Sequence, residues 1–339
     1  MTGNSKQLEL FRNEIEQSWQ NRHELGRLYY DIYNLKYFIY DQKENGKIRP
    51  LIKKDIKVNE KKITLKLRPQ VVADDNEVKV RYLNETDQNI LDFIIYKMSR
   101  EDFITIENKP SIMLSLNEIR EKLKVDSKRI KESLMLLSSY KVEFENDEYE
   151  GIIPSQLLES IVIQRGRAKK TLIRLSKGLM NYIYENKYLL MNYEQLFTFK
   201  NRLSKILYKR ICISNYMNFG ETDKQKFKLK ESICELLEKY GISYKNRLQK
   251  HRLFEDIEQA LEELKDNHII DLYELTPIIK KDFIKQTYRE VVADYSLSLY
   301  LSKKFSNRFS ADQKNKQRIE KELADKHIER MKKALLKKV

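Results

Sequence analysis

Clusters of Lys and Arg are the residues of this chain whose types and spacing could do chemistry. The chemistry they suit is the neutralisation of a phosphate backbone. The segment from Gln164 to Lys177 carries several basic residues and no acid, and Arg165-Gly166-Arg167 lies where the tip of a β-hairpin is expected. So many cations on a short ribbon repel one another unless a polyanion neutralises them. This segment is therefore a candidate nucleic-acid contact.

The composition agrees with a polyanionic partner. The 339 residues suffice for two or three domains, and an apolar content of 41% is enough to build hydrophobic cores. The net charge is +15, which in a folded chain most often indicates nucleic acid as the partner. The alternative interpretation is solubility alone, since an AT-rich genome also produces a Lys-rich chain with few Gly and Pro.

Catalytic chemistry finds little support in the motifs. The 8 glycines form neither GxxxxGK[ST] nor GxGxxG, so no loop that cradles the phosphates of a nucleotide cofactor is predicted. The four histidines are scattered singly, which argues against a His-x-His metal site. A Tyr series could suggest paired nucleophiles, but helical spacing without metal ligands favours a packed aromatic face: Tyr29, Tyr30, Tyr33 and Tyr37. We expect no catalytic residue, no metal and no cofactor, and hence no enzyme.

Cysteine use and the N-terminal residues indicate the compartment. Cys212 and Cys234 lie in apolar helical runs, without a CxxC motif, and predict buried free thiols. The first residues lack the apolar core of a signal peptide, and no apolar run approaches the length of a membrane span. The expected location is the cytoplasm, away from any membrane.

The elements around the basic hairpin predict a winged helix. A buried helix over residues 84–100 is followed by Ser115 and Glu118, a capping box that starts a second helix. After a tight turn at residues 124–126, Asp126 or Ser127 caps a third helix. A strand over residues 140–144, the short apolar runs Ile152-Ile153 and Ile161–Ile163, and the hairpin are expected to complete one sheet. The predicted DNA contacts are Ser127, Lys128, Arg129 and Lys131 on the third helix and Arg165, Arg167, Lys169 and Lys170 on the wing.

On the helices alone, an ordinary two-helix corner with solvated lysines fits equally well. The wing favours DNA binding.

A second copy of the same order follows. A helix over residues 196–217, a strand-like KFKLK and a helix over residues 233–240 lead to another basic-ended helix that buries Phe254, Ile257, Leu261 and Leu264. Two apolar runs, 269–275 and 283–293, are expected to join across Pro277 and Lys280-Lys281. The DNA contacts predicted here are Lys245, Asn246, Arg247, Lys250, His251, Arg252, Lys280 and Lys281. Two modules of one kind are less easily produced by chance than one.

The predicted fold class is α+β, mainly helical, with two tandem winged-helix domains. The expected divisions are a helical N-terminal leader over residues 1–55, the first domain over 56–190, the second over 191–300, and a basic tail over 301–339. From Lys303 onwards the tail holds 13 basic and 5 acidic residues, which fits an amphipathic helix, a mobile arm or a merely solvated tail.

This layout resembles the winged-helix plasmid replication initiators that bind iterons through two tandem winged-helix domains. The resemblance covers roughly residues 80 to 295. The segments that carry it are LNETDQNILDFIIYKM, SLNEIREKLKV, SKRIKESLMLL, TLIRLSKGLMNYI, YEQLFTFKNRLSKILYKRI with Leu203, Ser204, Leu207 and Tyr208, and FEDIEQALEELKDNHII. The leader and the long tail depart from the family's pattern.

The resemblance implies sequence-specific binding to repeated double-stranded origin sites, opening of the origin, and recruitment of host replication proteins such as a helicase or initiator. It also implies autoregulation of the chain's own promoter as a homodimer. Two alternatives stay open. One is a tandem winged-helix transcriptional regulator without initiator activity, and the other is a metal-dependent nicking initiator.

Overall fold

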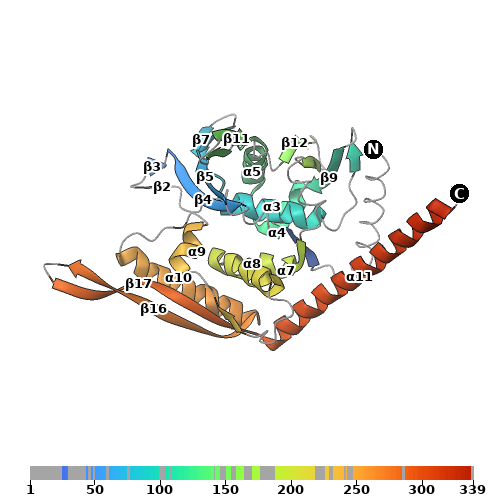
Figure 1. Ribbon diagram of the computed structural model, residues 1–339. Helices are drawn as coiled ribbons and strands as arrows, with labels where there is room; N and C mark the ends of the chain where they lie inside the picture. Colours follow the sequence, from blue (N-terminus) through green and yellow to red (C-terminus); the bar gives the residue numbers. More distant parts are fainter. Residues whose placement is uncertain are drawn as a thin grey trace.

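The chain folds into two modules of helices and strands, and a long C-terminal helix extends beyond them (Figure 1). This confirms the predicted α+β class. The computed structural model describes residues 25–29, 43–98 without 45–46, 49, 59–60 and 75–76, 104–145 without 107–108 and 141, 150–153, 158–163, 170–175, 188–217, 226–228, 232–239, 242, and 247–336 without 285–286.

The first module has the topology of a winged helix. Its helices are α3 (Glu85–Met98), α4 (Leu116–Leu123) and α5 (Ser127–Ser139). Its sheet contains β8 (Ile104–Ile106), β9 (Lys109–Ser115), β12 (Leu158–Ile163) and β13 (Lys170–Leu175), in the order β12-β13-β9-β8. The strand between the first two helices thus pairs with the second strand of the hairpin that follows the third helix.

Other strands of this region form separate sheets. β10 (Val142–Glu145) and β11 (Glu150–Ile153) join β4 (Ile52–Val58) and β5 (Lys61–Leu67) in the order β11-β10-β5-β4. The prediction that they continue the wing sheet is wrong, because β10 finds its backbone partners on β5. Two hairpins complete the region: β2 (Lys43–Glu44) with β3 (Lys47–Ile48), and β6 (Gln70–Asp74) with β7 (Glu77–Arg81).

The second module repeats this topology. After α7 (Tyr193–Thr198) come α8 (Arg202–Met217), β15 (Lys226–Lys228), α9 (Ile233–Lys239), α10 (Arg247–Asp266), β16 (Ile270–Ile284) and β17 (Thr287–Leu301). The strand order β15-β17-β16 matches β9-β13-β12 of the first module. The order of helices and strands predicted from the sequence is therefore present twice.

The second hairpin is longer than the sequence suggests. Pro277 and Lys280-Lys281 lie inside β16 rather than at the connection, since Pro277 pairs with Tyr295 and Lys280 with Val291. Both strands continue past the apolar runs because each remains paired with the other up to Ile284 and Thr287.

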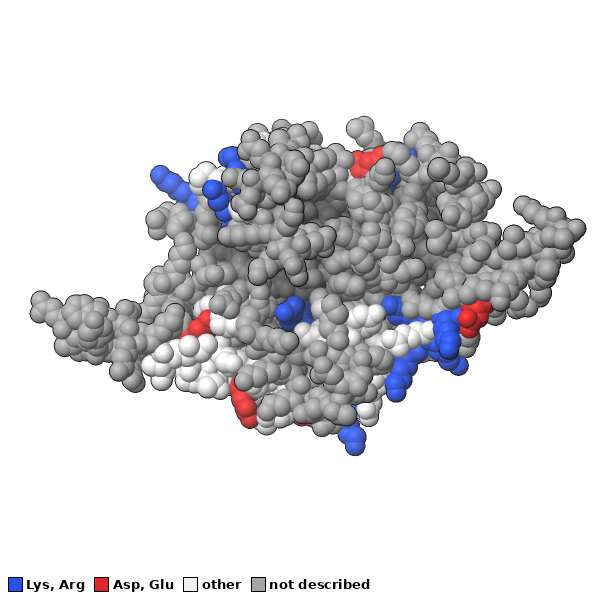
Figure 2. Space-filling view, viewed as in Figure 1, with Lys and Arg blue, Asp and Glu red and all other residues white. Residues whose placement is uncertain are grey.

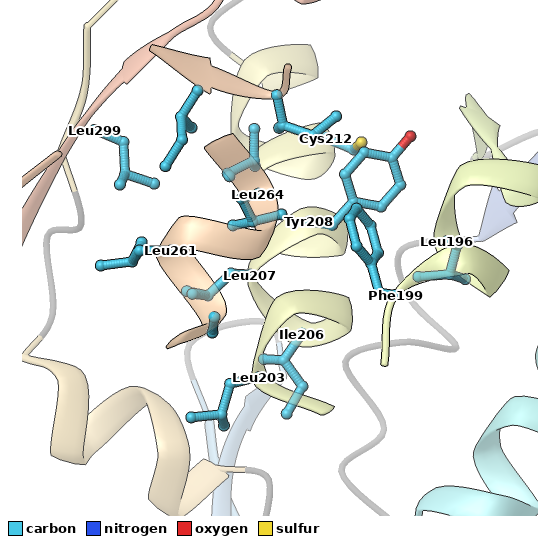
Figure 3. Close-up of a cluster of buried hydrophobic side chains, with 14 of the residues drawn as sticks. Leu196, Phe199, Leu203, Ile206, Leu207, Tyr208, Cys212, Leu261, Leu264 and Leu299 are labelled. Atoms are coloured by element: carbon cyan, nitrogen blue, oxygen red, sulfur yellow. The ribbon is translucent and has the colours of Figure 1, made fainter. Parts of the chain in front are cut away.

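Each module has its own buried core. In the first, α3, α4, α5 and β13 contribute Ile94, Ile119, Leu134 and Ile173, all almost without exposed surface. In the second, leucines of α8, α10 and β17 meet Phe199 and Tyr208 (Figure 3). Cys212 is a buried free thiol of this cluster, and Cys234 is a half-buried free thiol. Burial of one such large apolar side chain stabilises the fold by about 1.5–3 kcal/mol.

The first described strand pairs at the connection between the modules. β14 (Tyr188–Asn192) pairs with β1 (Leu25–Tyr29), so the leader prediction of a helix is wrong for Leu25–Tyr29. The spacing of Leu25 and Leu28 fits a helix, but pairing with β14 supplies the backbone hydrogen bonds instead. The helix predicted around Leu8 to Trp19 lies outside the described residues. The tail forms one helix, α11 (Lys303–Leu336), as the first of the alternatives predicted.

Candidate nucleic-acid interface

The helix-turn-helix of the first module is fixed by its turn and its cap. Lys124 adopts a left-handed conformation with φ 55°, and its N–H donates to the Arg120 carbonyl at 2.9 Å. Asp126, not Ser127, caps α5, because its carboxylate accepts the Arg129 N–H at 2.8 Å. Ser115 precedes α4 as predicted, but its side chain makes no capping hydrogen bond. Its backbone is held instead by pairing between β9 and Lys170 of β13.

The exposed side of α5 carries a short row of side chains suited to DNA. Lys128 and Lys131 are exposed on the side opposite the buried Ile130, Leu134 and Leu137, as predicted. Met135 continues the row and is 51% exposed. An apolar side chain there can contact a thymine methyl group in the major groove. The sequence prediction missed Met135, although its position four residues after Lys131 was a readable signal.

Arg129 differs from its basic neighbours. Its guanidinium Nη1 lies 3.3 Å from Oε2 of Glu132, whose side chain is only 7% exposed, and 23% of the Arg129 side chain is exposed. Arg129 therefore balances a buried carboxylate of its own helix. Its assignment as a DNA contact equivalent to Lys128 and Lys131 does not fit this geometry.

The first wing starts beside the helix-turn-helix. β12 and β13 pair as a hairpin up to Ile163 and Thr171, and Lys170 stands opposite Ser115 at the start of α4. The connection of this hairpin holds Arg165, Arg167 and Lys169, which lie outside the described residues.

The recognition helix of the second module begins with the predicted basic residues. Arg247, Lys250, His251 and Arg252 occupy the first two turns of α10, while Lys245 and Asn246 lie outside the described residues. Further along, the exposed residues are largely acidic, with Glu255, Glu262 and Asp266 among them. This acidic portion was not considered in the sequence prediction. Phosphates repel it, so only the N-terminal turns suit a DNA groove.

The second wing carries Lys280 and Lys281 near its far end. They pair with Val291 and Glu290, four and three residues before the end of β16. The sequence predicted that both lysines lie in the connection between the two strands, whereas both lie within β16, close to its end.

Ion pairs and aromatic rings join α3 and α4 to α7 and α8. Lys209 of α8 pairs with Asp92 of α3, and both side chains are almost fully buried. Burial lowers the pKa of Lys209, although the Asp92 carboxylate opposes this shift. A second ion pair joins the same two helices: Nζ of Lys205 in α8 lies 3.7 Å from Oε1 of Glu85 in α3. The sequence analysis did not identify these pairs, which hold the two modules in one frame.

Glu194 of α7 adds two further contacts across this junction. Its carboxylate accepts the Tyr96 hydroxyl at 3.2 Å and pairs with Lys122 of α4. The Tyr96 ring packs on Tyr193 at 5.5 Å and on Phe197 at 6.0 Å between centroids. Tyr96 of the first module therefore belongs to the hydrophobic cluster of the second.

The described residues support neither a metal site nor a membrane-spanning helix. Among them, no three His, Cys, Asp or Glu side chains are arranged to hold a metal ion. None of the described helices combines the length and apolar character needed to cross a membrane.

The fold, with basic residues at the N-terminal ends of α5 and α10, defines a tandem winged-helix protein. Residues 71–212 match the family described as initiator replication protein, WH1. The matched segment runs from β6 into α8 and so covers the helix-turn-helix and the wing of the first module. No curated protein sequence matches the chain.

Two solved structures are similar at low identity. One is the Pi initiator protein in complex with iteron DNA, with 13% identity, a TM-score of 0.43, and coverage of 64% of this chain and 91% of that chain. The other comprises domains 2 and 3 of RctB, with 10% identity, a TM-score of 0.42, and coverage of 84% of this chain and 98% of that chain.

Proposed function

We propose that the chain is a plasmid replication initiator that binds repeated double-stranded origin sites through both winged-helix domains. The observation that carries the proposal is the strand order of the first module, β9-β13-β12, repeated as β15-β17-β16 in the second. The family match of residues 71–212 supports the same role. Two recognition helices in one chain suit a site longer than a single helix can read.

The contacts are divided between base reading and backbone binding. Lys128 and Lys131 of the first module, with Met135 beside them, face outwards from α5. Arg247 and its basic neighbours open α10 and would read bases in a second stretch of groove. The wing residues Arg165 to Lys170 would neutralise phosphates.

The downstream steps are part of the same proposal. Binding would promote opening of the origin and recruit host replication proteins in the cytoplasm, and a homodimer would repress the chain's own promoter. The protein would perform no chemistry itself. A nick in supercoiled plasmid DNA, or a covalent link between protein and DNA, would contradict that last point.

Selection of bound sequences from random double-stranded DNA tests the proposal. We expect directly repeated sites of about two helical turns each, because two recognition helices in one rigid frame need that length. A lone palindrome would favour the tandem winged-helix transcriptional regulator instead. A plasmid that replicates with only this gene and the selected repeats would then separate an initiator from a regulator.

A further inference from the structure

One side of the first half of α11 is fixed to the connection between the modules. Gln313 is completely buried, and its amide clamps the backbone of Leu190 in β14. Nε2 donates to the Leu190 carbonyl at 2.9 Å, and Oε1 accepts the Leu190 N–H at 3.3 Å. Phe309 belongs to the second module's core, and the Lys316 ammonium lies 5.4 Å from the centroid of the Tyr216 ring. These contacts set the rotation of the helix about its own axis.

The opposite side of the same stretch is basic. Figure 2 shows Lys and Arg side chains gathered along this part of α11. The exposed residues between 303 and 321, among those whose exposure the structure describes, include no acid and no large apolar side chain. They are Lys303, Lys304, Asn307, Arg308, Ala311, Lys314, Asn315, Gln317, Arg318 and Lys321.

Four of these cations form a line along the helix. At 3.6 residues per turn, Lys303, Lys314, Arg318 and Lys321 fall within about 60° of one another around the axis. The line is about 27 Å long at 1.5 Å per residue. A DNA duplex rises about 3.4 Å per base pair, so the line is as long as about eight base pairs of duplex.

We propose that this face of α11, defined by Lys303, Lys314, Arg318 and Lys321, is a third DNA-binding surface that contacts backbone phosphates beside the sites of the two winged helices. The proposal rests on the proposed DNA-binding function. A protein partner would need a buried apolar centre in its interface, and the described exposed residues of this face offer none. Lysines held in a row by a rigid helix suit phosphates, which they bind without reading sequence.

Salt dependence of DNA affinity tests this surface. The variant K303Q/K314Q/R318Q/K321Q removes the four charges, and K47Q/K53Q/K200Q/K265Q removes four exposed charges elsewhere as the matched control. The probe is a labelled mixed-sequence duplex of about 40 base pairs, titrated between about 50 and about 200 mM salt. Each lost phosphate contact lowers the magnitude of the slope of log affinity against log salt by about 0.9. If all four side chains contact phosphates, the slope of the variant should be smaller than that of the parent by about 3.6.

The expected result is a slope lowered by two or more in the α11 variant and by less than half as much in the control. Equal slopes for the parent and the α11 variant would overturn the proposal and leave this face to an acidic protein surface. If the parent itself does not bind the duplex, the proposed function fails, which is a separate outcome. Circular dichroism melting of both variants verifies that the helix and the fold are retained.

Discussion

The recognition helices of the two modules share a topology but differ in the face that they expose. On α5 the exposed residues Lys128, Lys131 and Met135 cover about two turns without an acid. On α10 the exposed residues beyond Arg252 include Glu255 and Glu262. Carboxylates that face phosphates oppose the entry of a helix into a groove. We infer that α5 can enter the groove over most of its length, whereas α10 must enter with its N-terminal end.

The two wings differ in length, and here the second module has the more extended element. Each strand of the first wing has 6 residues, and each strand of the second has 15. The long hairpin extends away from the body of the module (Figure 1) and exposes Ile279 by 55% near a change of register after Ile278. The module with the more restricted helix thus has the longer wing. The first module suits contact by its helix, and the second by its helix end together with its wing.

The largest expected effect concerns the frame that the modules share. In Asp92→Ala, the buried Lys209 ammonium loses its partner, so the free energy of unfolding should fall by about 3–5 kcal/mol in urea denaturation. The matched control is Glu85→Ala, which removes a more exposed carboxylate of the same helix α3 and should cost under about 1 kcal/mol. The double variant Asp92→Leu with Lys209→Met should regain most of the loss. Similar small losses in both single variants would show that the modules do not depend on this pair.

The next effect tests base reading by the second module. Arg247 is the first residue of α10, and Arg247→Ala should cost about 1–3 kcal/mol in binding to the selected site. Preference at one base-pair position should be relaxed, because a bidentate contact to guanine is lost. The measurement is binding to a panel of single base-pair substitutions in the selected site. A variant that discriminates among these sites as the parent does would contradict the assignment of α10 as the recognition helix.

The sequence was sufficient to predict the repeated order of helices and strands. Apolar spacing in Ile90, Ile94, Ile130 and Leu134 follows the helical repeat, and these residues are buried as expected. What the sequence could not provide was pairing between distant segments. β1 meets β14 across more than 150 residues, and nothing local to Leu25–Tyr29 indicates that partner.

The same limit applies to the candidate interface. The N-terminal position of Arg247 on α10 could be read from apolar periodicity, but the pairing of Arg129 with Glu132 depends on which side of α5 is buried. Glu132 looks like a surface residue in the sequence. Its burial, and the pairing of Lys209 with Asp92, follow from packing between helices that the sequence does not specify.

A smaller effect separates the exposed face of α5 from the acidic end of α10. Lys128→Gln with Lys131→Gln should lower the salt slope by about 1.8, since two phosphate contacts are lost at about 0.9 each. Lys265→Gln, at the last turn of α10 beside Glu262, should leave the slope unchanged. Fluorescence anisotropy over a salt series measures both. If Lys265→Gln lowers the slope as much per removed charge as the α5 variant does, the acidic end of α10 lies close to DNA. The two helices would then lie along DNA in the same way.

The smallest effect belongs to the tip of the first wing. Lys169 precedes β13 in the basic segment, and Lys169→Gln should weaken binding to every sequence alike and lower the salt slope by about one. Lys281→Gln on the second wing provides the counterpart. The second wing is the longer one, so it can reach further into a groove. If Lys281→Gln changes base preference while Lys169→Gln weakens binding to all sequences alike, only the longer wing enters a groove. A change of base preference at Lys169 would instead contradict the assignment of the first wing to the phosphate backbone.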